Sequence, residues 1–132
     1  MLCEGSMKKE HVEIYQKAFD LKNAERFHES IVEFKRILES EGDPAQMCLM
    51  MIAILYYYEL DDYKSALPYA KQAVQLKPES EKASLCLAHC FFDAGLDAEV
   101  EKEIKRYVAT GGKIDFYQTL FDENGLTVED FT

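Results

Sequence analysis

Apolar residues recur at steps of three and four along most of this chain, and short polar or Gly/Pro stretches divide the pattern into segments of similar length. Such steps place apolar side chains on one face of an α-helix. Short joins between segments favour helices that pack antiparallel to their neighbours. The pattern predicts about seven helices, at about residues 8–22, 26–40, 44–60, 63–76, 80–94, 97–110 and 115–123.

Several boundaries carry specific stop and start signals. Gly42-Asp43-Pro44 breaks the pattern, with Asp43 placed to cap the next helix and Pro44 at its first position. Gly95 and Gly125 are expected to end the helices before them. The tail at residues 126–132 contains Thr127-Val128-Glu129-Asp130, a sequence able to cap another helix.

The helices form an internal repeat. Phe27, Tyr63 and Asp97 occupy equivalent places and are separated by 36 and 34 residues (63 − 27 and 97 − 63). A period of this length is typical of arrays in which each unit is one supersecondary motif. The repeating unit is therefore a pair of helices.

The residues of these pairs resemble tetratricopeptide repeats. Residues 63–78 resemble the second helix of such a repeat, with Ala66, Ala70 and the closing Pro78 in the expected places. The next unit supplies Leu87-Ala88 and Phe91 on its first helix. The resemblance implies an all-α, right-handed solenoid of about seven antiparallel helices, with repeats at about residues 11–43, 47–79 and 81–112 and a capping helix at 115–123.

This reading defines one domain. Residues 8–125 are expected to form the repeat domain, residues 126–132 a C-terminal tail, and residues 1–7 an N-terminal segment or tag remnant. The first residues have no apolar core of the kind found in a signal peptide. The expected location is therefore cytoplasmic.

The charge balance limits the partners. The chain carries 25 acidic and 15 basic residues, a formal charge of −10. A surface of this sign repels nucleic acids and anionic membranes, so neither is expected as a partner. It favours proteins or peptides that carry apolar anchors and some basic residues.

No catalytic or metal-binding constellation is apparent. The three histidines, at positions 11, 28 and 89, lie on different predicted helices, and no triad follows from their spacing. Cys86 and Cys90 flank His89 one helical turn apart, but a zinc site needs four ligands and no second pair is visible. The chain is therefore expected to be no enzyme and to use no metal or cofactor, with its thiols reduced and buried.

The resemblance implies that the first helices of the pairs line a concave face. Residues 47–58 contain no charged side chain, so this helix must be covered on every side. It is too short to cross a bilayer, which needs about 20 apolar residues. The predicted groove residues lie on the first helices, off their packing faces: Tyr15, Phe19, Met51, Leu55, Tyr58, Leu85, His89 and Phe92.

These observations favour a non-catalytic protein-protein interaction module, such as an adaptor, a chaperone or an immunity-type protein. The alternative is a homodimeric scaffold that buries the apolar face in self-association. The groove side chains could also be part of the core, or be covered by the tail. Leu55→Asp and Tyr58→Asp separate these readings: both are expected to abolish partner binding and keep helicity, whereas unfolding would place the residue in the core.

Overall fold

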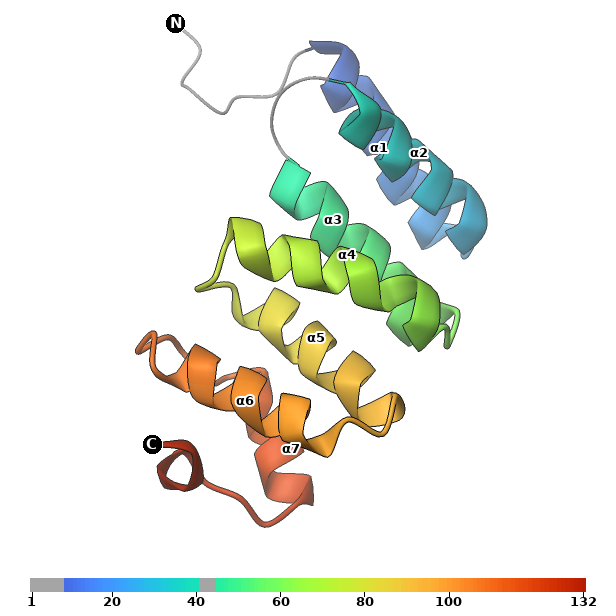
Figure 1. Cartoon of the computed structure of the whole chain (residues 1–132). Helices are drawn as coiled ribbons and strands as arrows, with labels where there is room; N and C mark the ends of the chain where they lie inside the picture. The colour runs from blue at the N-terminus through green and yellow to red at the C-terminus, as the bar shows by residue number, and fades with distance from the viewer. Residues whose placement is uncertain (1–8, 41–44) are drawn as a thin grey trace, which may run out of the picture.

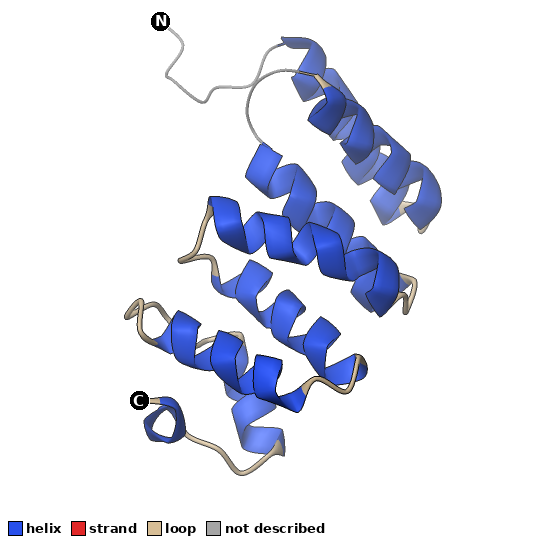
Figure 2. Cartoon of the chain, in the orientation of Figure 1, coloured by secondary structure: helices blue, strands red, loops and turns tan. Residues whose placement is uncertain are grey.

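The computed structural model describes residues 9–40 and 45–132. These residues form seven α-helices, one π-helical segment and one 3₁₀ turn, and no strand (Figures 1 and 2). The segment predicted at residues 1–7 and the cap predicted at Asp43 and Pro44 lie outside the described residues. The elements are α1 (Lys9–Asn23), α2 (Phe27–Glu39), α3 (Ala45–Ile54), η1 (Leu55–Glu59), α4 (Tyr63–Leu76), α5 (Glu81–Asp93), α6 (Asp97–Val108), α7 (Tyr117–Glu123) and η2 (Val128–Phe131).

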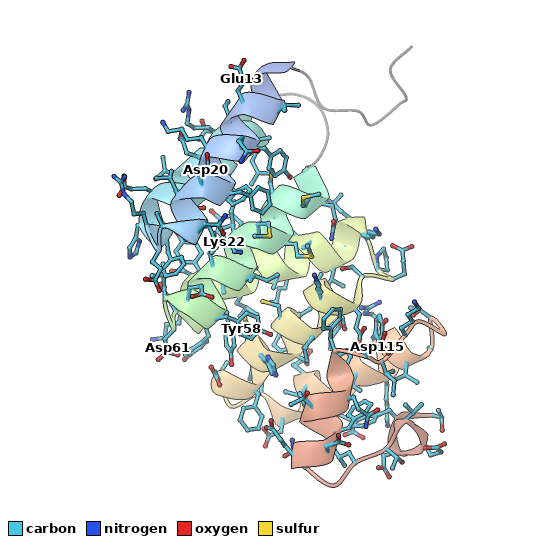
Figure 3. The ribbon with its side chains drawn as sticks, turned by 180° about the vertical axis from the view of Figure 1, so that it is seen from behind. Glu13, Asp20, Lys22, Tyr58, Asp61 and Asp115 are labelled. Carbon is cyan, nitrogen blue, oxygen red and sulfur yellow. The ribbon has the colours of Figure 1, made fainter. Side chains whose placement is uncertain are left out.

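The helices are stacked as consecutive pairs. α1 packs on α2, α3 on α4 and α5 on α6, and α2 and α4 also contact the first helix of the following pair. Figure 1 shows α2, α4 and α6 on the near side, whereas α1, α3, α5 and α7 face the viewer in Figure 3. The predicted all-helical solenoid is confirmed.

The turn inside each pair repeats its backbone geometry. Glu25 (φ 61°), Asp61 (φ 52°) and Gly95 (φ 75°) each adopt the left-handed conformation just after the first helix. They are separated by 36 and 34 residues (61 − 25 and 95 − 61), as the equivalent positions in the sequence are. A side chain in this conformation costs roughly 1 kcal/mol, which glycine avoids. The repeat is thus present in the backbone as well as in the sequence.

The core runs the length of the stack as three adjoining clusters. The first joins α1, α2 and α3 around Phe34, the second joins α3, α4 and α5, and the third joins α5 and α6 to α7. Ala66, Ala70 and Ala73 place only methyl groups in the middle cluster and are fully buried. Such small side chains allow α4 to approach its neighbours closely.

The third predicted helix is not α-helical throughout. Its last turn is the π-helix η1, in which the Leu60 N–H bonds to the Leu55 carbonyl at 3.0 Å. A π-turn contains one residue more than an α-turn, so it rotates the side chains before it relative to those after it. This extra residue changes which side chains of the segment reach the surface.

The tail folds back on the end of the stack. Thr127 and Asp130 form a capping box at the start of η2, so the cap predicted for this segment begins a 3₁₀ turn. Phe131 stacks on Phe121 of α7 with ring centroids 5.4 Å apart. Residues 126–131 thereby cover part of the last core cluster.

Candidate functional site

The first helices of the second and third pairs, together with α7, enclose a pocket of about 570 Å³. Its lining is mainly apolar, and we call it the central pocket. It lies on the side of the molecule that Figure 3 presents, where Tyr58 is labelled on η1. The central pocket is lined by Ile54, Tyr58, Lys82, Leu85, His89, Phe92, Phe116, Thr119, Leu120, Glu123 and Asn124.

Three aromatic residues that line this pocket are exposed to solvent. Phe92 is 63% exposed, Phe116 50% and Tyr58 44%. Single exposed apolar residues are ordinary, but apolar side chains gathered in one hollow are a common feature of interaction sites. The central pocket can therefore receive an apolar side chain.

Tyr58 and His89, which both line the pocket, are hydrogen-bonded to each other. The Tyr58 hydroxyl lies 2.7 Å from Nδ1 of His89, and the His89 ring stacks on Tyr57 with centroids 5.6 Å apart. Burial lowers the pKa of His89, and the nearby carboxylates of Asp93 and Glu123 only partly oppose this effect. The lowered pKa favours the neutral ring, whose Nδ1 can accept a hydrogen bond from the Tyr58 hydroxyl.

Charged groups lie at the edges of the pocket. The Lys82 ammonium stands over the Phe116 ring, 5.1 Å from its centroid, and Glu123 lines the pocket from α7. A cation over an aromatic face is attracted by the ring quadrupole and helps to hold the ring in place. The pocket thus offers an apolar floor with one basic and one acidic group beside it.

Four of the predicted groove residues come together in this pocket. Tyr58, Leu85, His89 and Phe92 all line it, from η1 and from one side of α5. On α5 they lie at steps of four and three residues, which places them along one face of that helix. These four residues are therefore the part of the predicted site that the structure brings together in one pocket.

Tyr15 and Leu55 require a correction. Leu55 is 0% exposed and Tyr15 4%, and both belong to the first core cluster. Tyr15 also stacks on Phe19, and the Cys48 thiol donates to its hydroxyl at 3.5 Å. Neither side chain is accessible to a partner, and the physical reason differs between them. Tyr15 is covered by α2 and α3, and Leu55 is turned inward where the π-helix begins.

Phe19 and Met51 are half-buried and do not line the central pocket. Both pack against the first core cluster, where the Phe19 ring meets Phe34 edge-on at 5.5 Å. Phe19 lies on α1 and Met51 on α3, and both face the cluster that joins α1, α2 and α3. We do not include them in the candidate site.

Two apolar contributions to the pocket were not predicted. Ile54 takes the place expected for Leu55, because the extra residue of η1 rotates the preceding part of the helix. The other is the α7 wall, and the spacing of Phe116 and Leu120 could have revealed it. The two residues are four apart, beside the buried pair Tyr117 and Phe121, and so form a second apolar face.

Metal-binding clusters and membrane-spanning helices are both absent from the described part of the chain. Within residues 9–40 and 45–132, no group of three or more His, Cys, Asp and Glu side chains is placed to hold a metal ion. No helix in this part of the chain has the length and apolar character needed to span a membrane.

Comparison with known proteins agrees with this architecture. Residues 57–118 match the family model of the tetratricopeptide repeat, which confirms the resemblance that the sequence predicts. The matched segment runs from η1 through α4, α5 and α6 into the first residues of α7. It therefore includes most of the residues that line the central pocket.

A solved structure has a similar fold. The crystal structure of PcrH in complex with the chaperone binding region of PopB superimposes with a TM-score of 0.68 over 81% of this chain and 85% of that chain. The sequences are 14% identical, so the likeness concerns the fold alone. No curated protein matched the sequence.

Proposed function

We propose that this chain is a non-catalytic interaction module that binds a segment of another polypeptide in the central pocket. The observation that carries the proposal is the convergence of exposed Tyr58, Phe92 and Phe116 in one apolar hollow. Tyrosine and phenylalanine bury large areas at low entropic cost and are frequent anchors of protein interfaces. The predicted domain at residues 8–125 would be the unit that binds.

The partner segment is expected to carry apolar anchors and some basic residues. The pocket accepts the anchors, and the formal charge of −10 favours a basic partner over an acidic one. A pocket formed by several neighbouring helices suits an extended or helical segment that packs its apolar side against them. An adaptor, chaperone or immunity-type role is compatible with this chemistry.

The structural neighbour supports this assignment at the level of the fold. That structure contains PcrH in complex with the chaperone binding region of PopB, so a fold of this kind can hold a polypeptide segment. For the present chain, the partner-binding residues follow from its own pocket. We propose that Tyr58, Leu85, His89 and Phe92 bind the partner, together with Ile54, Leu120 of α7 and Phe116 at the α7 N-cap.

The test replaces two exposed apolar residues, of which only one is expected to be needed for partner binding. Phe92 lines the pocket, whereas Leu76 at the end of α4 is 57% exposed and lines none of the described pockets. Wild type, Phe92→Asp and Leu76→Asp are used to capture partners from a lysate of the source cells, with identification by mass spectrometry. A partner held by wild type and Leu76→Asp, and lost by Phe92→Asp, is the expected result.

Two other results would contradict the proposal. A partner held equally by all three proteins would place binding elsewhere on the chain. A dimeric mass for the wild type in light scattering, lost only in Phe92→Asp, would favour the homodimeric scaffold. Circular dichroism on both variants verifies that the substitutions leave the fold intact.

A further inference from the structure

A second pocket adjoins the central pocket at the C-terminal end of the stack. Its volume is about 390 Å³, and we call it the end pocket. Phe92, Leu120 and Asn124 line both pockets, so the two hollows meet at these side chains. The apolar part of the end pocket is formed by Phe92, Val100, Ile104, Leu120, Leu126 and Phe131.

The two pockets differ in charge. The central pocket has one basic and one acidic residue in its lining, Lys82 and Glu123. The end pocket has the three carboxylates of Asp97, Glu101 and Asp130, and none of the described residues that line it is basic. An apolar hollow with carboxylates alone at its edge favours a ligand that is apolar along its length and cationic at its tip.

The carboxylates are held at this edge by local structure. Asp97 lies in the first turn of α6, where the helix dipole stabilises a negative charge. Asp130 is fixed by accepting the Thr127 N–H at 2.7 Å. Glu101 pairs with Lys105 at 3.1 Å on the exposed surface, and exposed pairs of this kind are weak. A cation from a partner can therefore compete for the Glu101 carboxylate.

We propose that the end pocket binds a lysine or arginine side chain of the same segment whose apolar anchor occupies the central pocket. The methylene stem would lie against Val100 and Ile104, and the cationic head would reach Asp97 and Glu101. The exposed face of Phe92 also attracts a cation. This proposal rests on the proposed function and adds a defined sequence requirement to the partner.

A second copy of this chain fits the end pocket less well. Each copy carries a formal charge of −10, so two copies repel each other at long range. A separate polypeptide with a basic residue beside its apolar anchor has no such cost. The two pockets together predict a partner motif that contains an apolar residue and, within reach along the segment, a lysine or arginine.

The test requires no knowledge of the natural partner. A phage-displayed library of random dodecapeptides is selected on the wild-type chain, and an enriched peptide is synthesised with a fluorescent label. Its affinity is measured by anisotropy for wild type, for Asp97→Asn/Glu101→Gln and for Asp61→Asn/Glu79→Gln. The last variant also removes two negative charges, but at exposed positions that line neither pocket, and so controls for overall charge.

The expected result is enrichment of peptides that combine apolar residues with lysine or arginine. Their affinity should fall about tenfold in Asp97→Asn/Glu101→Gln, remain within about twofold of wild type in the control, and weaken with added salt. Replacing the basic residue of the peptide by glutamine should reduce binding to wild type and leave binding to Asp97→Asn/Glu101→Gln unchanged.

Other outcomes overturn the proposal in distinguishable ways. Enriched peptides without basic residues, bound equally by all three proteins and lost in Phe92→Asp, would refute the end pocket and leave the proposed function standing. A dimer that dissociates only in Asp97→Asn/Glu101→Gln would make a second copy the occupant. No enrichment on the wild type would contradict both proposals.

Discussion

Glu81, in the first turn of α5, accepts a hydrogen bond from the backbone N–H of Tyr117 at 2.9 Å. The same carboxylate oxygen accepts the N–H of Phe116 at 2.7 Å. A helix as short as α7 is not stable alone in water, so these contacts are needed to position it. The Tyr117 hydroxyl adds a 2.7 Å contact to Ser84, also on α5. One wall of the central pocket thus depends on the α5 helix.

Glu81→Ala is expected to loosen α7 without unfolding the stack. It leaves two N–H groups of the α7 terminus without their acceptor, at a cost of about 1.5–3 kcal/mol. Hydrogen exchange should become faster in residues 116–123 and stay unchanged in α3 and α4. Glu79→Ala, at an exposed position two residues earlier, is the control. Unchanged protection of α7 in Glu81→Ala would contradict this role of Glu81.

The structure separates two substitutions that the sequence treats alike. Leu55→Asp places a carboxylate in the first core cluster and should cost more than about 4 kcal/mol. Tyr58→Asp alters a side chain that is 44% exposed and removes one hydrogen bond, so a loss of about 1 kcal/mol is expected. Thermal unfolding followed by circular dichroism measures both. Equal melting temperatures for the two variants would rule out the buried position of Leu55.

The stability of the chain should depend on pH through His89. Its lowered pKa means that, between that value and about 6.5, the unfolded chain binds more protons than the folded chain. The free energy of unfolding therefore falls as the pH decreases through this range, by at most about 1.4 kcal/mol per pH unit. His89→Gln removes this dependence.

Guanidinium unfolding at pH 7.5, 6.5 and 5.5 gives the free energy of unfolding of wild type and of His89→Gln at each pH. Carboxylates that do not interact with His89 are common to both proteins and cancel in the comparison. Burial alone would raise the pKa of Glu33, but Lys17 and Arg36 bind its carboxylate and lower it. Glu33 therefore titrates below the pH range of this measurement. If the free energy of unfolding changed equally with pH in the two proteins, His89 would have the same pKa in the folded and unfolded chains.

The buried thiols should be protected from alkylation. Cys48, Cys86 and Cys90 are fully buried and free. Burial raises the pKa of Cys48, and the hydrogen bond to Cys90 together with burial raises that of Cys86. Because the thiolate is the reactive form, iodoacetamide at pH 7.5 should label these three slowly in the folded protein and rapidly in guanidinium. Peptide mass spectrometry reads each site, and fast labelling of the folded protein would contradict the packing around α3 and α5.

Much of the architecture was determined by local sequence. The spacing of Phe27, Tyr63 and Asp97 predicted the helix pairs, and the predicted helices match α2, α4, α5 and α6 to within about two residues. This succeeds because helical periodicity and turn residues such as Gly95 act over a few neighbouring positions. The α5 part of the site, at Leu85, His89 and Phe92, follows from the same regularity.

Only the tertiary structure decided which other side chains reach the surface. The π-helix at Leu55–Glu59 turned Leu55 into the core and brought Ile54 into the central pocket, a rotation that apolar residues on all sides of this helix do not reveal. Tyr15 became buried because α2 and α3 close over it. The α7 wall and the acidic edge of the end pocket join residues far apart along the chain. Such contacts depend on how helices pack against one another, and that packing is set by the whole stack of repeats.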